Sequence, residues 1–230
     1  MRDLAKRLGR RTFLALGAAA LVLGRHESTA SADEEDYPLD DISRSVPRHG
    51  PLRCPKDDLV VYKGTSVRYD VPTRVHPAFQ GRLEMMEKVV VDLAEEIYGR
   101  APSRLVHAGT FVCRRIGGYP ELLSEHGLGN AIDVEGFDFP PLPKDASPPR
   151  DLPKALRGAF SVRMSTHWKT KTGPAAVHRR FLHTLGHRLV ARKDIFRVLL
   201  GPSYPGHTTH YHFDVAPYRL VDIFGDDDRA

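Results

Sequence analysis

The chain has 230 residues, a formal net charge of +5 and a hydrophobic fraction of 41%. Residues 1–32 hold six Lys or Arg and two Asp or Glu, so they carry +4 of this charge and leave the remainder close to neutral. The charge therefore does not indicate a nucleic-acid partner, and none is expected. The remaining ~198 residues are enough for one well-packed domain.

The first 32 residues have the order of features typical of a secretory signal. Basic residues precede an apolar run from Phe13 to Leu23 that is too short to span a membrane, and Ala30-Ser31-Ala32 follows as a small-residue cleavage site. The pair Arg10-Arg11 favours the twin-arginine export route. An amphipathic surface helix is the alternative. We expect a protein exported to the periplasm or the extracellular space, with no stable membrane anchor once the signal is removed.

The segment after the signal is acidic, then polar, and has no hydrophobic periodicity. This composition predicts a flexible tether over 33–51, ahead of a domain that spans 52–220 and a short tail at 221–230. Within the domain, apolar stretches at 59–62 and 66–69 flank a glycine-containing turn, which predicts a short hairpin.

The next elements are a helix, two strands and a long loop. From residue 83 onward, apolar side chains recur at three- and four-residue steps and predict a helix that ends at Gly99. Two short strands are expected between residues 104 and 115, with a turn at Ala108-Gly109. Seven prolines in 138–174 predict an ordered surface loop of the kind that often borders a substrate cleft.

The last third of the sequence predicts a second helix at 175–191 and strands at 195–200 and 209–215. Short strands mixed with two helices indicate an α+β fold. We expect a small antiparallel sheet with two main helices packed on it and the long proline-rich loop at its surface.

Cys54 and Cys113 are the two cysteines of the chain, and in an exported protein such a pair is more often bonded than free. We expect a disulfide that closes a loop of about 60 residues and stabilises the fold by up to about 4 kcal/mol in the chain-entropy model. The alternative is that Cys113 is a metal ligand or a nucleophile. A thiolate nucleophile would need its own activating base.

Two segments, Ser124 to Asp133 and His207 to His212, offer the donor atoms of a three-ligand zinc site. Zinc accepts imidazole nitrogens and carboxylate oxygens, and a catalytic site keeps three protein ligands with the fourth position open for water. His126, Asp133 and His212 fit that count. If the two segments meet in the fold, the sequence predicts a metal-dependent hydrolase.

Strand alternation places His210, His212 and Asp214 on one face of the final strand. Residues two apart on a strand lie about 7 Å apart, so His212 can bind a metal while His210 stands near the bound water, in the position of a general base. The remaining histidines of the second half of the chain are interpreted as surface or packing residues; they are His167, His178, His183 and His187.

The combination S-x-H-x-x-G-x-A-x-D and H-x-x-H-x-H resembles the signature of zinc peptidases related to lysostaphin, D-Ala-D-Ala metallopeptidases and the hedgehog amino-terminal domain. Within that group the chain most resembles the extensin-like C-terminal domain family, over roughly Leu52 to Pro217. This resemblance implies one Zn²⁺ per chain with His126, Asp133 and His212 as ligands. It also implies His210 as catalytic base or water-orienting residue.

The same resemblance implies further site residues. His207 would be a supporting catalytic histidine, and Arg114 would orient the substrate. Ser124 is a second substrate-binding candidate, although a serine before a glycine-rich turn can simply cap the loop. The carboxypeptidase branch of the group has a glutamate where this chain has His210, so endopeptidase activity is favoured. Extensin-like domains often carry a further cysteine, and this chain has none.

For an exported peptidase of this kind, the expected substrate is peptidoglycan, cut in its stem peptides or cross-links. The alternative function is a zinc-containing cell-wall binding domain without turnover, as hedgehog illustrates for this metal centre. A copper or nickel scavenger fits less well, because the ligand set includes a carboxylate and one open position.

Overall fold

The computed structural model describes residues 37–225, except residue 57. The expected signal at 1–32 and the last residues of the expected tail lie outside this range. Among the described residues, none of the helices combines the length and the apolar character needed to cross a bilayer.

The described chain forms ten strands, three α-helices and two short 3-10 helices. The strands are β1 (Val60–Tyr62), β2 (Thr73–Val75), β3 (Arg104–Gly109), β4 (Arg115–Ile116), β5 (Tyr119–Leu123), β6 (Ala131–Phe139), β7 (Phe160–Arg163), β8 (Val198–Leu200), β9 (Tyr211–Asp214) and β10 (Leu220–Asp222). The helices are α1 (Pro77–Tyr98), α2 (Met164–His167), α3 (Ala176–Ala191), η1 (Glu125–Leu128) and η2 (Lys154–Leu156).

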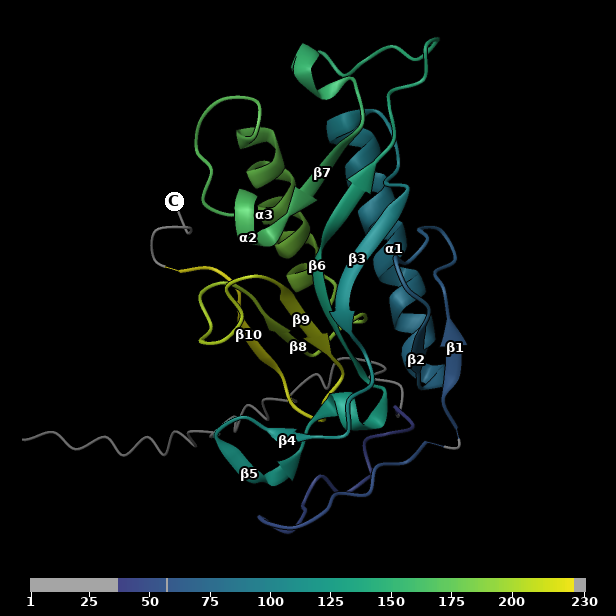
Figure 1. The fold of residues 1–230 in the computed structure, drawn as a ribbon, viewed down its shortest axis with the longest axis vertical. Helices are drawn as coiled ribbons and strands as arrows, with labels where there is room; N and C mark the ends of the chain where they lie inside the picture. The colour runs from purple at the N-terminus through teal and green to yellow at the C-terminus, as the bar shows by residue number, and fades with distance from the viewer. Residues whose placement is uncertain (1–36, 57, 226–230) are drawn as a thin grey trace, which may run out of the picture. The chain divides into compact units, whose positions relative to one another are not determined.

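The main sheet has six strands in the order β10-β8-β9-β6-β3, with β7 pairing to the second half of β6 (Figure 1). All of its pairs are antiparallel except β10 with β8. The long helices α1 and α3 contact each other and lie behind this sheet (Figure 1). The α+β prediction is therefore confirmed, with one parallel pair added at the sheet edge.

Both long helices form where the hydrophobic periodicity predicts them. In α1, buried side chains repeat at three- and four-residue steps, and the helix ends at Gly99, whose φ of 70° lies in the left-handed region. The Gly99 N–H donates to the Glu95 carbonyl, which is the usual glycine-terminated helix end. In α3, Phe181, Leu185 and Leu189 form the buried stripe.

The predicted hairpin between 59–62 and 66–69 is wrong, because β1 pairs with β2 instead. The buried carboxylate of Glu87, on α1, accepts hydrogen bonds from the backbone N–H groups of Thr65, Ser66 and Val67 at 2.6–3.2 Å. Backbone donors turned toward this carboxylate do not enter a strand ladder, so the segment forms a loop.

Two other expectations about strands need correction. Residues 104–114 contain one strand, β3, and residues 110–114 continue as a loop instead of a second strand; β4 begins at Arg115. The expected loop over 138–174 is interrupted, because the end of β6 pairs with β7 and α2 follows. The remaining proline-rich stretch covers the end of α1, where Arg100 donates to the carbonyls of Leu156 and Gly158.

The domain extends beyond both predicted boundaries. Residues 37–51, expected as a tether, pack onto the domain: Tyr37 and Leu39 are buried, and Ser45 forms an antiparallel bridge with Leu122 of β5. At the other end, β10 joins the sheet and Ile223 is buried within the expected tail. Hydrogen bonds to residues far away in the sequence hold these two segments on the domain. Hydrophobic periodicity therefore does not predict that the segments belong to it.

Candidate metal centre

Two of the three predicted ligands come from neighbouring strands of the main sheet. Asp133 on β6 and His212 on β9 are direct partners in the antiparallel register. Side chains at such positions project from the same face, with Cβ atoms about 5 Å apart. His212 Nδ1 accordingly lies 2.9 Å from Asp133 Oδ1.

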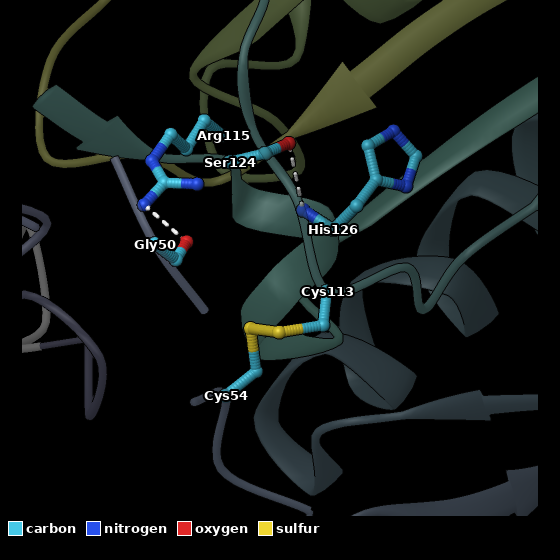
Figure 2. The surroundings of a disulfide bond; sticks show 6 residues. All are labelled: Gly50, Cys54, Cys113, Arg115, Ser124 and His126. Carbon is cyan, nitrogen blue, oxygen red and sulfur yellow. Dashed lines mark hydrogen bonds between the residues drawn. A yellow bond between two sulfur atoms is a disulfide. The ribbon is translucent and has the colours of Figure 1, made fainter. Parts of the chain in front are cut away.

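The third ligand, His126, is presented by the 3-10 helix η1, which leads into β6. Ser124 caps this helix, with Oγ accepting from the His126 N–H at 3.4 Å (Figure 2). Gly129 ends it with a φ of 64°, and a Cβ there would lie 2.5 Å from Leu59 Cδ2. The side chain of Ser124 thus holds the turn that positions His126, as expected for a loop cap. This contact gives no support to the predicted substrate-binding role of Ser124.

The three donor atoms form a compact triangle. His126 Nε2 lies 3.2 Å from His212 Nδ1 and 3.3 Å from Asp133 Oδ1, and the third side is the 2.9 Å distance between Asp133 and His212. Tetrahedral zinc with bonds of about 2.0–2.1 Å separates its ligand atoms by about 3.3 Å. Within the described residues, this is the group of His, Cys, Asp and Glu side chains that could hold a metal ion. The donor set and its spacing fit zinc.

Each imidazole is also held by a partner on its other nitrogen. His126 Nδ1 lies 3.0 Å from the Thr110 carbonyl, and His212 Nε2 lies 2.7 Å from Asp214 Oδ2. Donating Nδ1–H and Nε2–H in these bonds leaves His126 Nε2 and His212 Nδ1 free to bind a metal. The sequence places Asp214 on the right face but does not identify it as the partner of His212.

The carboxylates around His212 set its charge. Burial favours the neutral imidazole, but hydrogen bonds to Asp133 and Asp214 outweigh burial and raise the pKa of His212 to about 9. Burial would also raise the pKa of Asp133, yet its hydrogen bonds to His126 and His212 hold that pKa well below the usual range. Asp133 is therefore ionised, and a metal ion and a proton compete for His212 Nδ1.

The other two predicted histidines lie beside the triangle. His210 immediately precedes β9, and its Nε2 is 3.7 Å from Asp133 Oδ1. The ring of His207 lies 5.0 Å from that of His210 and 5.6 Å from that of His212. Burial lowers the pKa of both His207 and His210, which favours their neutral forms near pH 7. The five residues predicted as metal ligands or catalytic histidines thus gather at one place.

The predicted disulfide is present between Cys54 and Cys113, with an S–S distance of 2.10 Å. It excludes Cys113 as a metal ligand or nucleophile. The bond lies under the turn of His126, because a Cβ at Gly127 would be 3.1 Å from Cys54 Sγ (Figure 2). Arg114 follows Cys113 with an exposed side chain, and its carbonyl accepts from the Ser124 N–H at 3.0 Å.

A buried polar network behind the turn was not foreseen in the sequence. Glu125 accepts two hydrogen bonds from Arg44, at 2.8 and 3.1 Å, and one from the amide of Asn130. Asn130 Oδ1 in turn accepts from the Tyr37 hydroxyl. These contacts join the segment that begins at Tyr37 to the residues that flank His126.

Comparison with known proteins gives one family. Residues 37–141 match the family described as Extensin-like protein C-terminus, a range that contains His126, Asp133 and both cysteines but ends before β9. No curated protein and no solved structure gives a match. The match begins at Tyr37, the first residue that the structure describes. It supports the resemblance to the extensin-like C-terminal family that the sequence indicates.

Proposed function

We propose that this protein is an exported, zinc-dependent peptidase that hydrolyses peptide bonds in the stem peptides or cross-links of peptidoglycan, as an endopeptidase. The observation that carries the proposal is the donor triangle of His126, Asp133 and His212. Two of its sides, 3.2 and 3.3 Å, match the ligand separation of tetrahedral zinc and the third is shorter at 2.9 Å, and both imidazoles have outer partners.

Three protein ligands of this kind are typical of catalytic zinc sites, whereas structural sites have four. Bound zinc would polarise a scissile carbonyl and lower the pKa of a water toward neutrality. Export is proposed from the composition of residues 1–32, and the disulfide is compatible with an oxidising compartment.

In this proposal, His210 is the general base. Its Nε2 is the nitrogen that faces the donor triangle, 3.7 Å from Asp133 Oδ1. Burial keeps this imidazole neutral, so Nε2 accepts a proton from the attacking water and returns it to the leaving amine. His207 packs against the His210 ring and limits its orientation, with Nδ1 on the Pro205 carbonyl at 3.1 Å.

Arg114 is proposed to hold the substrate. Its guanidinium is exposed and forms no ion pair among the described residues, so its fork of donors is available to a peptide carboxylate or to the developing oxyanion. Ser124 is assigned a positioning role instead, because its hydroxyl caps the turn of His126.

The test is incubation of the zinc-loaded protein with defined muropeptides, followed by mass spectrometry of the products. We expect cleavage within the peptide portion, with product masses that identify the bond. A protein that holds one zinc per chain and binds muropeptides without releasing any product would instead be a cell-wall binding domain.

A further inference from the structure

A basic hollow lies beside the metal centre and has no part in metal binding. Its volume is about 790 Å³, and it opens to solvent. It is lined by two short segments, residues 52–56 and 113–115, that the disulfide ties together. A hollow of this size falls in the range that accommodates a small ligand or several residues of a peptide.

The lining carries four cationic side chains, and no acidic side chain is among the described residues that form it; the four are Arg53, Lys56, Arg114 and Arg115. Arg115 has a structural task, because it donates to the carbonyls of Pro47 and Gly50 at 2.7–3.0 Å (Figure 2). The side chains of Arg53 and Lys56 are exposed and form no hydrogen bond or ion pair with any other described residue. Together with Arg114, three cationic side chains without such partners therefore face one hollow.

A segment that lines the hollow is hydrogen-bonded to the segment that carries His126. The Val112 N–H donates to the His126 carbonyl at 3.2 Å, and the Ser124 N–H donates to the Arg114 carbonyl at 3.0 Å. Residues 112–114 therefore run alongside residues 124–126. Residues 113 and 114 line the hollow, and residues 124–126 include the donor His126, so the hollow adjoins the segment that presents this donor.

We propose that this hollow is a substrate subsite in which Arg53 and Lys56 bind a carboxylate of the peptide, away from the bond that is cut. The inference rests on the proposed peptidase function and deepens it, because it names the substrate class as peptides that carry a free carboxylate at a distance from the scissile bond. The planar guanidinium of Arg53 matches a carboxylate in two-point contact, and Lys56 adds a second positive charge.

The experiment measures binding, not turnover. The probes are the peptide L-Ala-γ-D-Glu-L-Lys-D-Ala-D-Ala with free carboxylates and the same peptide with both carboxylates converted to carboxamides. Their affinities are measured by isothermal titration calorimetry for the wild type and for Arg53→Gln/Lys56→Gln. Two exposed charge contacts are together worth about tenfold in affinity. We expect the wild type to prefer the free carboxylates by about tenfold and the double variant to lose that preference.

The matched control is Lys63→Gln/Arg68→Gln, which removes the same charge from exposed residues that do not line the hollow. This variant should keep the tenfold preference. An equal loss in the control, or an unchanged preference in Arg53→Gln/Lys56→Gln, overturns the subsite. Displacement of the peptide by millimolar inorganic phosphate as effectively as by the free-carboxylate peptide also overturns it, since the hollow would then be a general anion site.

Each titration is made with metal-free and with zinc-loaded protein, and products are followed by mass spectrometry in parallel. Carboxylate-dependent binding without any cleavage would support the subsite and contradict the peptidase. Cleavage that is indifferent to the carboxamide substitution would support the peptidase and contradict the subsite. The results therefore distinguish a failure of the subsite proposal from a failure of the peptidase proposal.

Discussion

Asp133 and His212 face each other across the β6–β9 pair, and the 2.9 Å between their donor atoms is one side of the triangle that His126 completes. Because both lie on central strands of the sheet, their separation is fixed by strand pairing and does not depend on a loop. The proposed metal centre is therefore preorganised, and the metal affinity that we propose for it should respond sharply to each donor.

Removal of any one donor should remove most of the bound metal. For Asp133→Asn, His126→Ala and His212→Ala we expect zinc affinity to fall by more than about 100-fold, beyond the 10- to 100-fold typical of outer partners. Zinc content after dialysis, measured by elemental analysis, checks this. The exposed His49→Ala serves as the control and should retain the wild-type content. Full zinc retention in any of the three ligand variants would contradict the assignment.

Asp214 should raise the zinc affinity of the centre without being a ligand itself. Asp214→Asn replaces the carboxylate that accepts from His212 Nε2, so we expect zinc affinity about 10- to 100-fold lower with the fold intact. Competition with a chromophoric chelator gives the dissociation constant. Asp151→Asn, an exposed change in the proline-rich loop, should have no effect. An unaltered dissociation constant for Asp214→Asn would show that the bond does not orient the ligand.

His210 should separate metal binding from turnover. Because its ring lies beside the triangle and contributes no side to it, His210→Ala should keep zinc near one per chain. General acid–base catalysis is typically worth about 10²- to 10⁴-fold, so muropeptide hydrolysis should fall by that factor. Steady-state rates together with zinc content check the prediction. A variant that hydrolyses at the wild-type rate would remove His210 from the mechanism.

The disulfide should stabilise both the fold and the turn that carries His126. It spans a sequence separation of 59 residues, so Cys54→Ser/Cys113→Ser should lower the free energy of unfolding by up to about 4 kcal/mol. Zinc affinity should fall too, because Cys54 Sγ packs under Gly127. Urea unfolding with and without a reductant measures the first effect. The reductant should destabilise the wild type and leave the double variant unchanged.

Buried His178 should make the fold less stable in mild acid. Burial, reinforced by the charge of His167, lowers its pKa to about 4. An unfolded histidine titrates near 6.5. Between these values the unfolded chain binds a proton that the folded chain does not, so the unfolding free energy falls as pH drops from 6.5 to 4.

The contribution of His178 to this loss is on the order of 2 kcal/mol. Urea unfolding at pH 7 and pH 4.5 for the wild type and His178→Gln checks the prediction, and the variant should lose less stability over that interval. Equal losses would mean that other groups set the acid sensitivity.

The sequence predicts that His126, Asp133 and His212 come together, because strand alternation and the position of a turn place them. Strand alternation fixes the faces of Asp133 and His212, and the glycine-rich turn fixes where the chain reverses after His126. The helices α1 and α3 follow equally directly from their apolar stripes. These features depend on residues close in sequence, or on the alternation of side chains between the two faces of a single strand.

The sequence does not predict contacts between polar groups that are far apart along the chain. Glu87 draws the N–H groups of residues 65–67 out of the expected hairpin, although about 20 residues separate them. Asp214 shares a face with His212, but alternation does not say that its carboxylate turns toward Nε2. No local pattern indicates such pairs, because each depends on the completed fold.

The hydrogen bonds of Arg44 and Tyr37 decide where this protein can be shortened. A shortened protein that starts at residue 52, where the apolar pattern begins, lacks Arg44. The carboxylate of Glu125, which is only 5% exposed, would then have no guanidinium to pair with. An uncompensated internal charge of this sort costs about 3–5 kcal/mol. A protease that cleaves between Arg44 and residue 52 would release the same guanidinium. The turn that positions His126, next to Glu125, would then be less stable.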